Sequence, residues 1–450
     1  MSSYKFPRDF VWGVATSSYQ IEGAHDVDGR KPSIWDTFSH TAGKVANGDT
    51  GDVACEHYYR WENDLDLIRD LGVNAYRFSV AWPRVLPDGT GQVNQKGLDF
   101  YDRLVDGMLE RGLEPYCTLY HWDLPQVLED AGGWTNRDTA HAFAEYADVV
   151  TKHLGDRVVS YATLNEPWCS AYLGYMNGHH APGHKDAKMS HQATHNLLLA
   201  HGLACPRIRD NAPKADLGIV LNLMQIYPET DSAEDMAAAV RMDSVHNLFY
   251  LDPMFKGNYP QELLDNWGDT APVIQDGDLN IINAPLDYIG LNYYTPAFIK
   301  HGGDAWPQLA DVERPGKEQT DMGWEVYAQG LSDMLERLSR DYGLPVYVME
   351  NGAAYPGDEV VDGEVHDPGR VSYYERHVKA TQSAIENGAD VRGYFAWSLM
   401  DNFEWAFGYD KRFGIVYVDF ETQKRTLKDS AKWYRNLVLE QRKQLVDAAD

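Results

Sequence analysis

Several features that mark other classes of protein are scarce or missing in this chain. Its four cysteines, Cys55, Cys117, Cys169 and Cys205, lie far apart without paired metal-type spacing, so we expect free thiols. The absence of any run of about 18 apolar residues argues against a membrane-spanning helix. The first residues contain no apolar signal core, so we expect a cytoplasmic protein.

Lysine is the scarcest charged residue. The chain has 17 Lys, 23 Arg, 23 Glu and 45 Asp, and its formal net charge is −28. Such an acidic surface disfavours binding to nucleic acid or to anionic membranes. Two explanations stay open: adaptation to a high-salt (halophilic) cytoplasm, and the ordinary solubility of an acidic protein.

Two predicted strands each end in a glutamate. The apolar run 346–349 leads into Glu350, and an Asn-Gly turn follows it. The run 158–164 leads in the same way to Asn165 and Glu166. A carboxylate at the end of a buried strand is costly unless it is paired or used. Two such carboxylates brought together are the minimum needed to cleave a glycosidic bond.

Strand-like runs alternate with helical patterns along the whole chain, which predicts a parallel sheet. Eight such units predict an α/β fold, a single (β/α)8 TIM barrel that forms one catalytic domain over residues 1–450. A barrel of this kind needs about 250 residues, so the surplus is expected in long βα loops. The predicted strands are 10–15, 74–80, 115–120, 158–164, 217–223, 288–291, 346–350 and 391–397, and the longest loops are 16–57, 168–190, 224–285, 295–325 and 398–425.

Polar and aromatic side chains stand at the C-terminal end of nearly every predicted strand. In a closed barrel these ends meet at one mouth, where active sites are built. Carboxylates and amides bind vicinal hydroxyls, and flat rings stack on the C–H faces of a sugar, so a neutral sugar is the predicted ligand. These residues are Gln20, Arg77, His121, Trp122, Asp123, Asn165, Glu166, Asn222, Asn292, Tyr293, Tyr294, Glu350 and Trp397.

From Phe6 to about Tyr434 the chain resembles the glycoside hydrolase family 1 β-glycosidases. Any one of the matching motifs would be weak evidence, but the ordered set is specific. The motifs are FVWGVAT (10–16), RFS (77–79), HWD (121–123), TLNEP (163–167), NYY (292–294), ENG (350–352) and WSLMDNFEW (397–405). The resemblance implies a retaining enzyme that removes terminal β-D-glucosyl, and also galactosyl or fucosyl, residues through a covalent glycosyl-enzyme. It implies no cofactor, no metal, and small β-glycosides or short β-linked oligosaccharides as substrates.

The resemblance also implies a role for each matched residue. Glu166 matches the general acid/base, and Glu350 matches the nucleophile, with Arg77 and Tyr294 holding it. Met349 stands where the family often has Thr, and we expect it to face away from the site. The substrate-binding set is Gln20, His121, Trp122, Asn165, Asn292, Tyr294, Glu404 and Trp405, with Trp397 as the stacking floor, and the leaving-group side has Trp168, Asn222 and Trp324.

The alternatives concern substrate and activity. Thioglycosidases of this type have Gln at the position of Glu166, so an O-glycosidase is favoured. Glu404 would repel a phosphate, so a 6-phospho-β-glycosidase is a lesser alternative, together with a transglycosylase. A catalytically silent sugar-binding barrel would need to have lost one of the two glutamates, and both are present. Glucose, galactose and fucose, the aglycone and the oligomeric state stay open.

A histidine-rich segment, residues 178–184, could suggest a metal site, with His191, His195 and His201 following it. His191 and His195 lie one turn apart on a predicted helix, but no Glu stands between them as in the metalloprotease pattern. We therefore predict a structural loop here.

Overall fold

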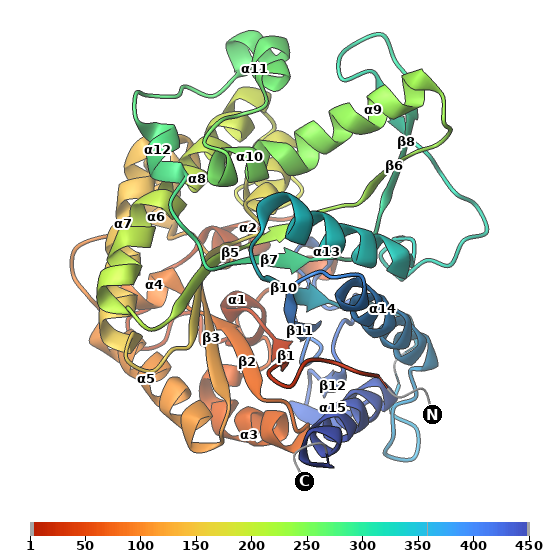
Figure 1. Cartoon of the computed structure of the whole chain (residues 1–450). Helices are drawn as coiled ribbons and strands as arrows, with labels where there is room; N and C mark the ends of the chain where they lie inside the picture. Colours follow the sequence, from red (N-terminus) through yellow and green to blue (C-terminus); the bar gives the residue numbers. More distant parts are fainter. Residues whose placement is uncertain (1–3, 358, 448–450) are drawn as a thin grey trace.

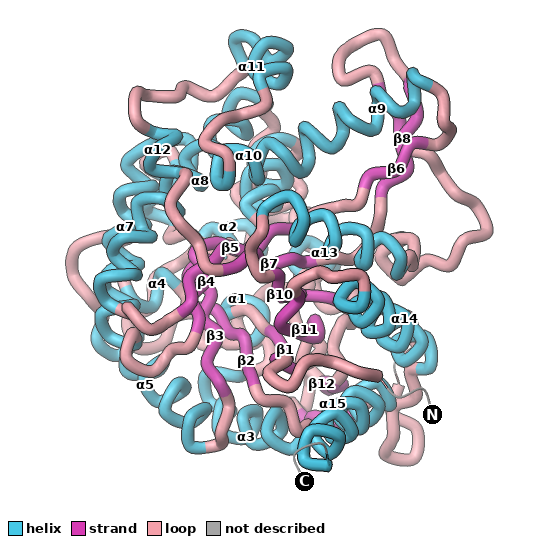
Figure 2. Tube along the Cα trace, viewed as in Figure 1, coloured by secondary structure: helices cyan, strands magenta, loops and turns pink. Residues whose placement is uncertain are grey.

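The computed structural model describes residues 4–357 and 359–447 (Figure 1). Eight of its strands are parallel and close into a barrel (Figure 2), which confirms the predicted (β/α)8 fold. Around the barrel the order is β1–β11–β10–β7–β5–β4–β3–β2, with the bounds β1 (Val11–Ala15), β2 (Ala75–Ser79), β3 (Glu114–Tyr120), β4 (Ser160–Asn165), β5 (Asp216–Asn222), β7 (Tyr288–Asn292), β10 (Val346–Asn351) and β11 (Val391–Trp397). The predicted ends of these strands are accurate to within about two residues, a good result for element boundaries.

Helices fill the connections and surround the barrel (Figure 2). Their apolar faces pack on the strands, as in the residue 95–110 helix, which buries Leu98, Tyr101, Leu104 and Met108. No helix within the described ranges is long and apolar enough to cross a bilayer. The helices are α1 (Ser18–Ile21), α2 (Ile34–Ser39), α3 (His57–Asp70), α4 (Trp82–Val85), α5 (Gln95–Glu110), α6 (Gln126–Asp130), α7 (Arg137–Leu154), α8 (Ala187–Asn211), α9 (Ala233–Asp243), α10 (Phe249–Phe255), α11 (Gln261–Trp267), α12 (Asp278–Ile282), α13 (Ala328–Tyr342), α14 (Pro368–Glu386) and α15 (Asp429–Asp447). Short or irregular helices are η1 (Ala46–Gly48), η2 (Gly133–Thr135), η3 (Cys169–Met176), η4 (Ser244–Leu248), η5 (Gly268–Thr270) and η6 (Trp405–Phe407).

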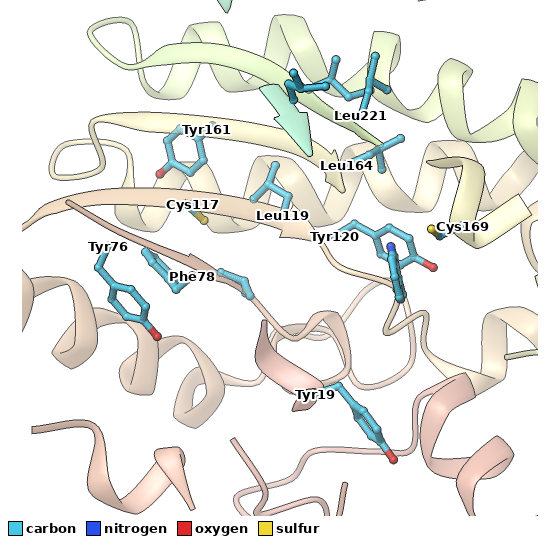
Figure 3. Packing of buried hydrophobic residues seen from close by; sticks show 14 of the residues in the cluster. Tyr19, Tyr76, Phe78, Cys117, Leu119, Tyr120, Tyr161, Leu164, Cys169 and Leu221 are labelled. Carbon is cyan, nitrogen blue, oxygen red and sulfur yellow. The ribbon is translucent and has the colours of Figure 1, made fainter. Parts of the chain in front are cut away.

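Side chains of the barrel strands alternate between two packed layers, because successive residues of a strand point to opposite faces. In β11, Phe395 and Trp397 belong to the inner layer, whereas Tyr394 and Ala396 pack outward against the helices. Figure 3 shows outward-facing residues of β2 to β5, such as Leu119. Large inner side chains fill the barrel, so a binding cavity can form only at its mouth.

Part of the sequence predicted as long loops is regular structure. The segment 224–285 contains α9 to α12 and the strand β6 (Ile226–Pro228). Together with β8 (Ala297–His301) and β9 (Leu309–Asp311), β6 forms a small sheet that sits with α9 away from the barrel (Figure 1). A further pair, β12 (Val416–Asp419) and β13 (Lys424–Leu427), lies in the last predicted loop. Four of these five strands have only three or four residues, which is too short to show a period in the sequence.

Molar salt is expected to raise the melting temperature of this protein by a few degrees. Its net charge of −28 makes the compact state repel itself. The Debye length falls from about 30 Å at 0.01 M salt to about 3 Å at 1 M, which screens this repulsion. Thermal melts in dilute buffer and in molar KCl, both with EDTA, measure the effect, and equal osmolality of sucrose is the control for non-ionic stabilisation. An unchanged melting temperature in KCl would contradict adaptation to high salt.

Candidate active site

A cavity of about 440 Å³ opens where β7, β10 and β11 end, at the mouth of the barrel. Most of the site residues predicted from the sequence line it: His121, Trp122, Glu166, Trp168, Asn222, Asn292, Tyr294, Trp324, Glu350, Trp397, Glu404 and Trp405. The other three, Gln20, Arg77 and Asn165, are buried and contact the lining residues from behind. The fold therefore brings these residues into one region. Asp123 and Tyr293, which we also expected at the mouth, do not line the cavity: Asp123 is buried and accepts from Ser18 Oγ at 2.6 Å, and Tyr293 packs in the outer core layer.

An irregularity in β10 turns Glu350 into the barrel. Val348 pairs with Leu291 of β7, but the next pair joins Glu350 to Asn292, so Met349 is an extra residue in the strand. In a regular strand, Glu350 would point to the same outer face as Val348 because side chains alternate. Such bulges re-aim side chains beside active sites.

The bulged Met349 is also directed inward. It is buried in the inner layer of the barrel, in the same cluster as Trp397. Gly290 makes room for it, since a Cβ built on this glycine would lie 3.0 Å from Met349 Cγ. Met349 does not line the cavity, but it shares the inner face of the barrel with Glu350. The alternation from which we predicted that it faces away from the site is interrupted by the bulge.

The strand that leads to Glu166 is irregular in the same way. In the pairing of β4 with β5, Ala162 lies opposite Gly218 and Asn165 lies opposite Val220, so β4 contains an extra residue. The backbone N–H of Glu166 then donates to Val220 O at 2.9 Å. Both acidic residues of the site are thus placed by a local departure from the strand pattern.

Strained backbone conformations gather around the cavity. Trp122, Glu166 and Trp405 have positive φ angles of 83°, 48° and 51°. Each such residue costs about 1–3 kcal/mol and persists only where the surrounding structure holds it. One such restraint is the hydrogen bond from Trp122 Nε1 to Asn165 O, 2.8 Å. Strain of this kind is typical of functional sites.

Two donors hold the carboxylate of Glu350. Arg77 Nη1 lies 2.7 Å from Oε1 and Tyr294 Oη lies 2.6 Å from Oε2. Burial raises the pKa of Glu350, while the charge of Arg77 and the hydrogen bond from Tyr294 oppose this rise. Arg77 Nη2 also donates to Asn165 Oδ1 at 2.6 Å, which fixes the guanidinium. Glu350 is better suited than Glu166 to stay ionised, because these two donors stabilise its anion.

Glu166 has the opposite environment. Burial, followed by the nearby charge of Glu350, raises the pKa of Glu166 to about 8. Asn292 Nδ2 donates to Oε1 at 2.6 Å, and the thiol of Cys169 donates to Oε2 at 3.1 Å. A proton donor and an anion in one site require different environments, and here only Glu350 has an arginine as a direct partner.

Several buried polar atoms at the cavity have no hydrogen-bond partner among the described residues. They are His121 Nδ1, His180 Nδ1, Asn292 Oδ1 and Glu404 Oε2. Burial, and then the charges of Glu350 and Glu166, raise the pKa of Glu404 to about 8. Burial and the charge of Arg77 hold the pKa of His121 well below its usual range, so its ring is neutral. Buried groups without partners are costly, and hydroxyl groups of a ligand would satisfy them.

Flat rings also form part of the cavity lining. The ring of His121 is nearly parallel to those of Trp397 and Trp405, with centroids 5.7 and 6.0 Å apart. Trp122 packs on Trp405 at 4.4 Å. Rings held in this way offer apolar faces on which the C–H side of a pyranose can stack.

Some residues of the cavity were not predicted. His179 and His180 line it, although their segment was expected to be only a structural loop. His180 is buried, which lowers its pKa to about 3, and its ring lies 5.3 Å from that of Trp122. The sequence showed the histidines but not the direction in which they point. Cys169 and the apolar lining residues gave no chemical signal at all: Leu173, Leu223, Met224, Met322, Ala406, Phe407 and Phe413.

The remaining histidines noted in the sequence have partners within the fold. His195 bonds to Tyr259 and Asp278, and His201 bonds to Thr163. In residues 4–357 and 359–447, no group of three or more His, Cys, Asp or Glu side chains is placed to hold a metal ion. The histidine-rich region is thus built into helix packing and into the cavity wall.

Comparisons with known proteins identify relatives that match almost the whole chain. The chain is 50% identical to a β-glucosidase from Agrobacterium sp., over 96% of this chain and 95% of the relative. It is 49% identical to β-glucosidase A of Thermotoga maritima, over 97% and 98%.

Solved structures are equally similar. The virulence factor SghA of Agrobacterium tumefaciens, in complex with its substrate analog salicin, has a TM-score of 0.94 and 51% identity over 97% of this chain and 96% of that one. The T. maritima family 1 β-glucosidase in complex with isofagomine lactam has a TM-score of 0.94 and 48% identity, over 97% and 99%. The model of glycosyl hydrolase family 1 matches residues 2–443. The chain therefore belongs to glycosyl hydrolase family 1.

Proposed function

We propose that this protein is a retaining β-glucosidase, with the chain forming one catalytic domain. The observation that carries the proposal is the unequal pair of buried carboxyl groups. Glu350 is held as an anion by Arg77 and Tyr294, while burial and the charge of Glu350 keep Glu166 protonated. The relatives named β-glucosidase support glucose as the sugar. A bifunctional β-D-glucosidase/β-D-fucosidase of Bifidobacterium breve, 49% identical over 96% of this chain and 98% of the relative, supports fucosides as additional substrates.

In the first step, the Glu350 carboxylate attacks the anomeric carbon as the bond to the leaving oxygen breaks. Glu166 gives its proton to that oxygen, and a covalent glycosyl-enzyme forms. In the second step, Glu166 takes a proton from water, the water oxygen bonds to the anomeric carbon, and Glu350 is released. This mechanism needs the carboxyl groups of Glu166 and Glu350 to lie about 5–5.5 Å apart. Asn292 supports this short separation, because its amide donates to Glu166 and its hydrogen bond also lowers the pKa of Glu350.

The other predicted residues surround the reacting sugar. We assign Trp397 as the stacking floor and Trp168, Asn222 and Trp324 to the leaving-group side. The unpartnered atoms of His121 and Glu404 suit sugar hydroxyls. The remaining hydroxyl-binding set is Gln20, Trp122, Asn165, Asn292, Tyr294 and Trp405.

An unphosphorylated sugar is favoured, but for a different reason from the one drawn from the sequence. With a pKa of about 8, Glu404 is largely protonated at neutral pH and would not repel a phosphate strongly. The residues that line the cavity in the described chain include no lysine or arginine. A phosphate would therefore lack the cation that binds it.

The configuration of the first product tests the proposal. With 4-nitrophenyl β-D-glucoside, proton NMR is expected to show β-glucose first, with α-glucose appearing later by mutarotation. Parallel assays on the galactoside, the fucoside and the 6-phosphoglucoside define the sugar, and product analysis separates hydrolysis from transglycosylation. If α-glucose appears first, the retaining mechanism is wrong. Cytoplasmic location and adaptation to high salt stay predictions.

A further inference from the structure

A second cavity, of about 500 Å³, shares a wall with the active site. Trp168, Met224 and His246 line both cavities and so form the partition between them. His246 is buried, whereas Trp168 and Met224 are partly exposed. Trp168 and Met224 thus have accessible surface at the partition, on the side that we assign to the leaving group of a substrate.

The partition is held in place from the second cavity. Tyr172 stacks on Trp168 with ring centroids 4.8 Å apart and planes 13° from parallel. The ring of His246 also lies 4.8 Å from Trp168, and its Nε2 donates to Asn222 O at 3.1 Å. A ligand that extends beyond this wall would thus meet a preformed surface rather than a mobile one.

Aromatic and thioether groups make up much of the second cavity. His191 and Trp267 stack with centroids 3.7 Å apart, next to Phe249. The methionines Met176 and Met242 are adaptable side chains that fit ligands of different shape. Small organic ligands occupy cavities of about 300–1,000 Å³ with linings of this kind.

Most polar side chains of the cavity have hydrogen-bond partners within the protein, and the exposed carboxylate of Asp311 lies at its rim. Ser190 donates to Ala171 O, Thr270 donates to Trp267 O, and Asn266 donates to Glu262 O, at 3.0, 2.9 and 2.8 Å. Buried Trp306 Nε1, in contrast, has no hydrogen-bond partner in the part of the chain that the structure describes. A sugar unit carries several hydroxyl groups that would each need a partner, whereas an aromatic ring needs at most one.

We propose that this cavity is a distal subsite that takes the second ring of an aryl aglycone. The aglycone passes over the Trp168–Met224 edge, and its outer ring lies among the aromatic walls. This inference rests on the proposed β-glucosidase activity. It narrows the substrate class to β-glucosides whose leaving group contains two linked aromatic rings.

Filling the cavity tests the proposal. Met242→Trp places a large ring in the cavity, and Met236→Trp is the matched control, because Met236 is on the same helix, is 52% exposed and is not part of the cavity lining. The substrates are 4-nitrophenyl β-D-glucoside, the 4′-nitrobiphenyl-4-yl β-D-glucoside and cellotriose. We expect Met242→Trp to lower kcat/KM for the two-ring substrate by about tenfold, the effect of losing one aromatic contact surface. The one-ring substrate and cellotriose should change by less than about twofold, and Met236→Trp should change none of them.

The other possible outcomes contradict the subsite, the aryl assignment or the proposed function, as follows. Equal loss on the one-ring and two-ring substrates, or no loss on either, overturns the subsite. Loss on cellotriose alone assigns the cavity to a sugar and overturns the aryl assignment. If Met242→Trp does not fold, Trp267→Ala removes a cavity wall and should show the same selective loss. If the wild-type protein is inactive on the one-ring glucoside, the proposed function is wrong. The cavity can then still be tested by calorimetry, which should show that 4-phenylphenol binds to the wild type but not to Met242→Trp.

Discussion

Glu350→Gly is expected to lower kcat by more than about 10⁴-fold, because it removes the proposed nucleophile. The missing side chain leaves space at the anomeric carbon, so azide or formate should restore activity on a substrate with a good leaving group. Azide would attack from the face that Glu350 occupies and displace the aglycone once. The product should therefore be the α-glucosyl azide. Release of the chromophore and NMR of the azide product measure both effects.

The control for this rescue is Glu350→Gln. Its side chain has nearly the same volume as Glu but is a poor nucleophile, so it should be as inactive as the glycine variant and should respond little to azide. Arg77 and Tyr294, which bond to Glu350 at 2.7 and 2.6 Å, remain in both variants. A β-configured azide from Glu350→Gly would show that the nucleophile lies elsewhere.

Glu166→Ala is expected to lower kcat/KM by about 10²–10⁴-fold on glucosides with poor leaving groups, which need a proton from this residue. A 2,4-dinitrophenyl leaving group needs no proton, so its release in the first step should be nearly spared. The second step lacks its base, so the glycosyl-enzyme should accumulate and KM should fall. Azide should now react with that intermediate and yield the β-glucosyl azide.

The pH profile gives a second measurement of the same assignment. Glu166 must be protonated in the first step, so activity on a poor leaving group should fall as pH rises through its pKa of about 8. Glu166→Gln should lack this alkaline limb on the dinitrophenyl substrate. Cys169→Ala is a useful neighbour control, since it removes only the 3.1 Å thiol contact and should keep the limb. An alkaline limb that is unchanged in Glu166→Gln would mean that another group titrates.

The order of elements and the chemistry of the site could be predicted from the sequence. Alternating strand and helix patterns allow few arrangements other than a parallel barrel. Once the barrel is assumed, residues such as Arg77, Asn292 and Trp397 must gather at its mouth, because the C-terminal ends of all strands meet there. The kind of ligand follows from these side chains before any coordinates are known.

Local exceptions to the strand period were decided only by the tertiary structure. Alternation counted from the outward-facing Val348 turns Glu350 outward, whereas pairing with β7 creates the bulge that brings Glu350 to the same inner face as Met349. No sequence pattern predicts this bulge, because it depends on how β10 pairs with the neighbouring strand and on the space beside Gly290.

The second cavity is also a product of packing between distant segments. Its walls come from α8, α9, η4, α10, α11 and the loop before β9, which are separate stretches of sequence. Their apolar residues look like ordinary core residues in the sequence, because a side chain that lines a cavity and one that fills a core have the same composition.

The sequence by itself determined the barrel, its mouth and the two acidic residues. Only the fold decided where Glu350 points, which histidines face the cavity and where space remains beside Trp168, because each of these depends on contacts between residues far apart in the chain.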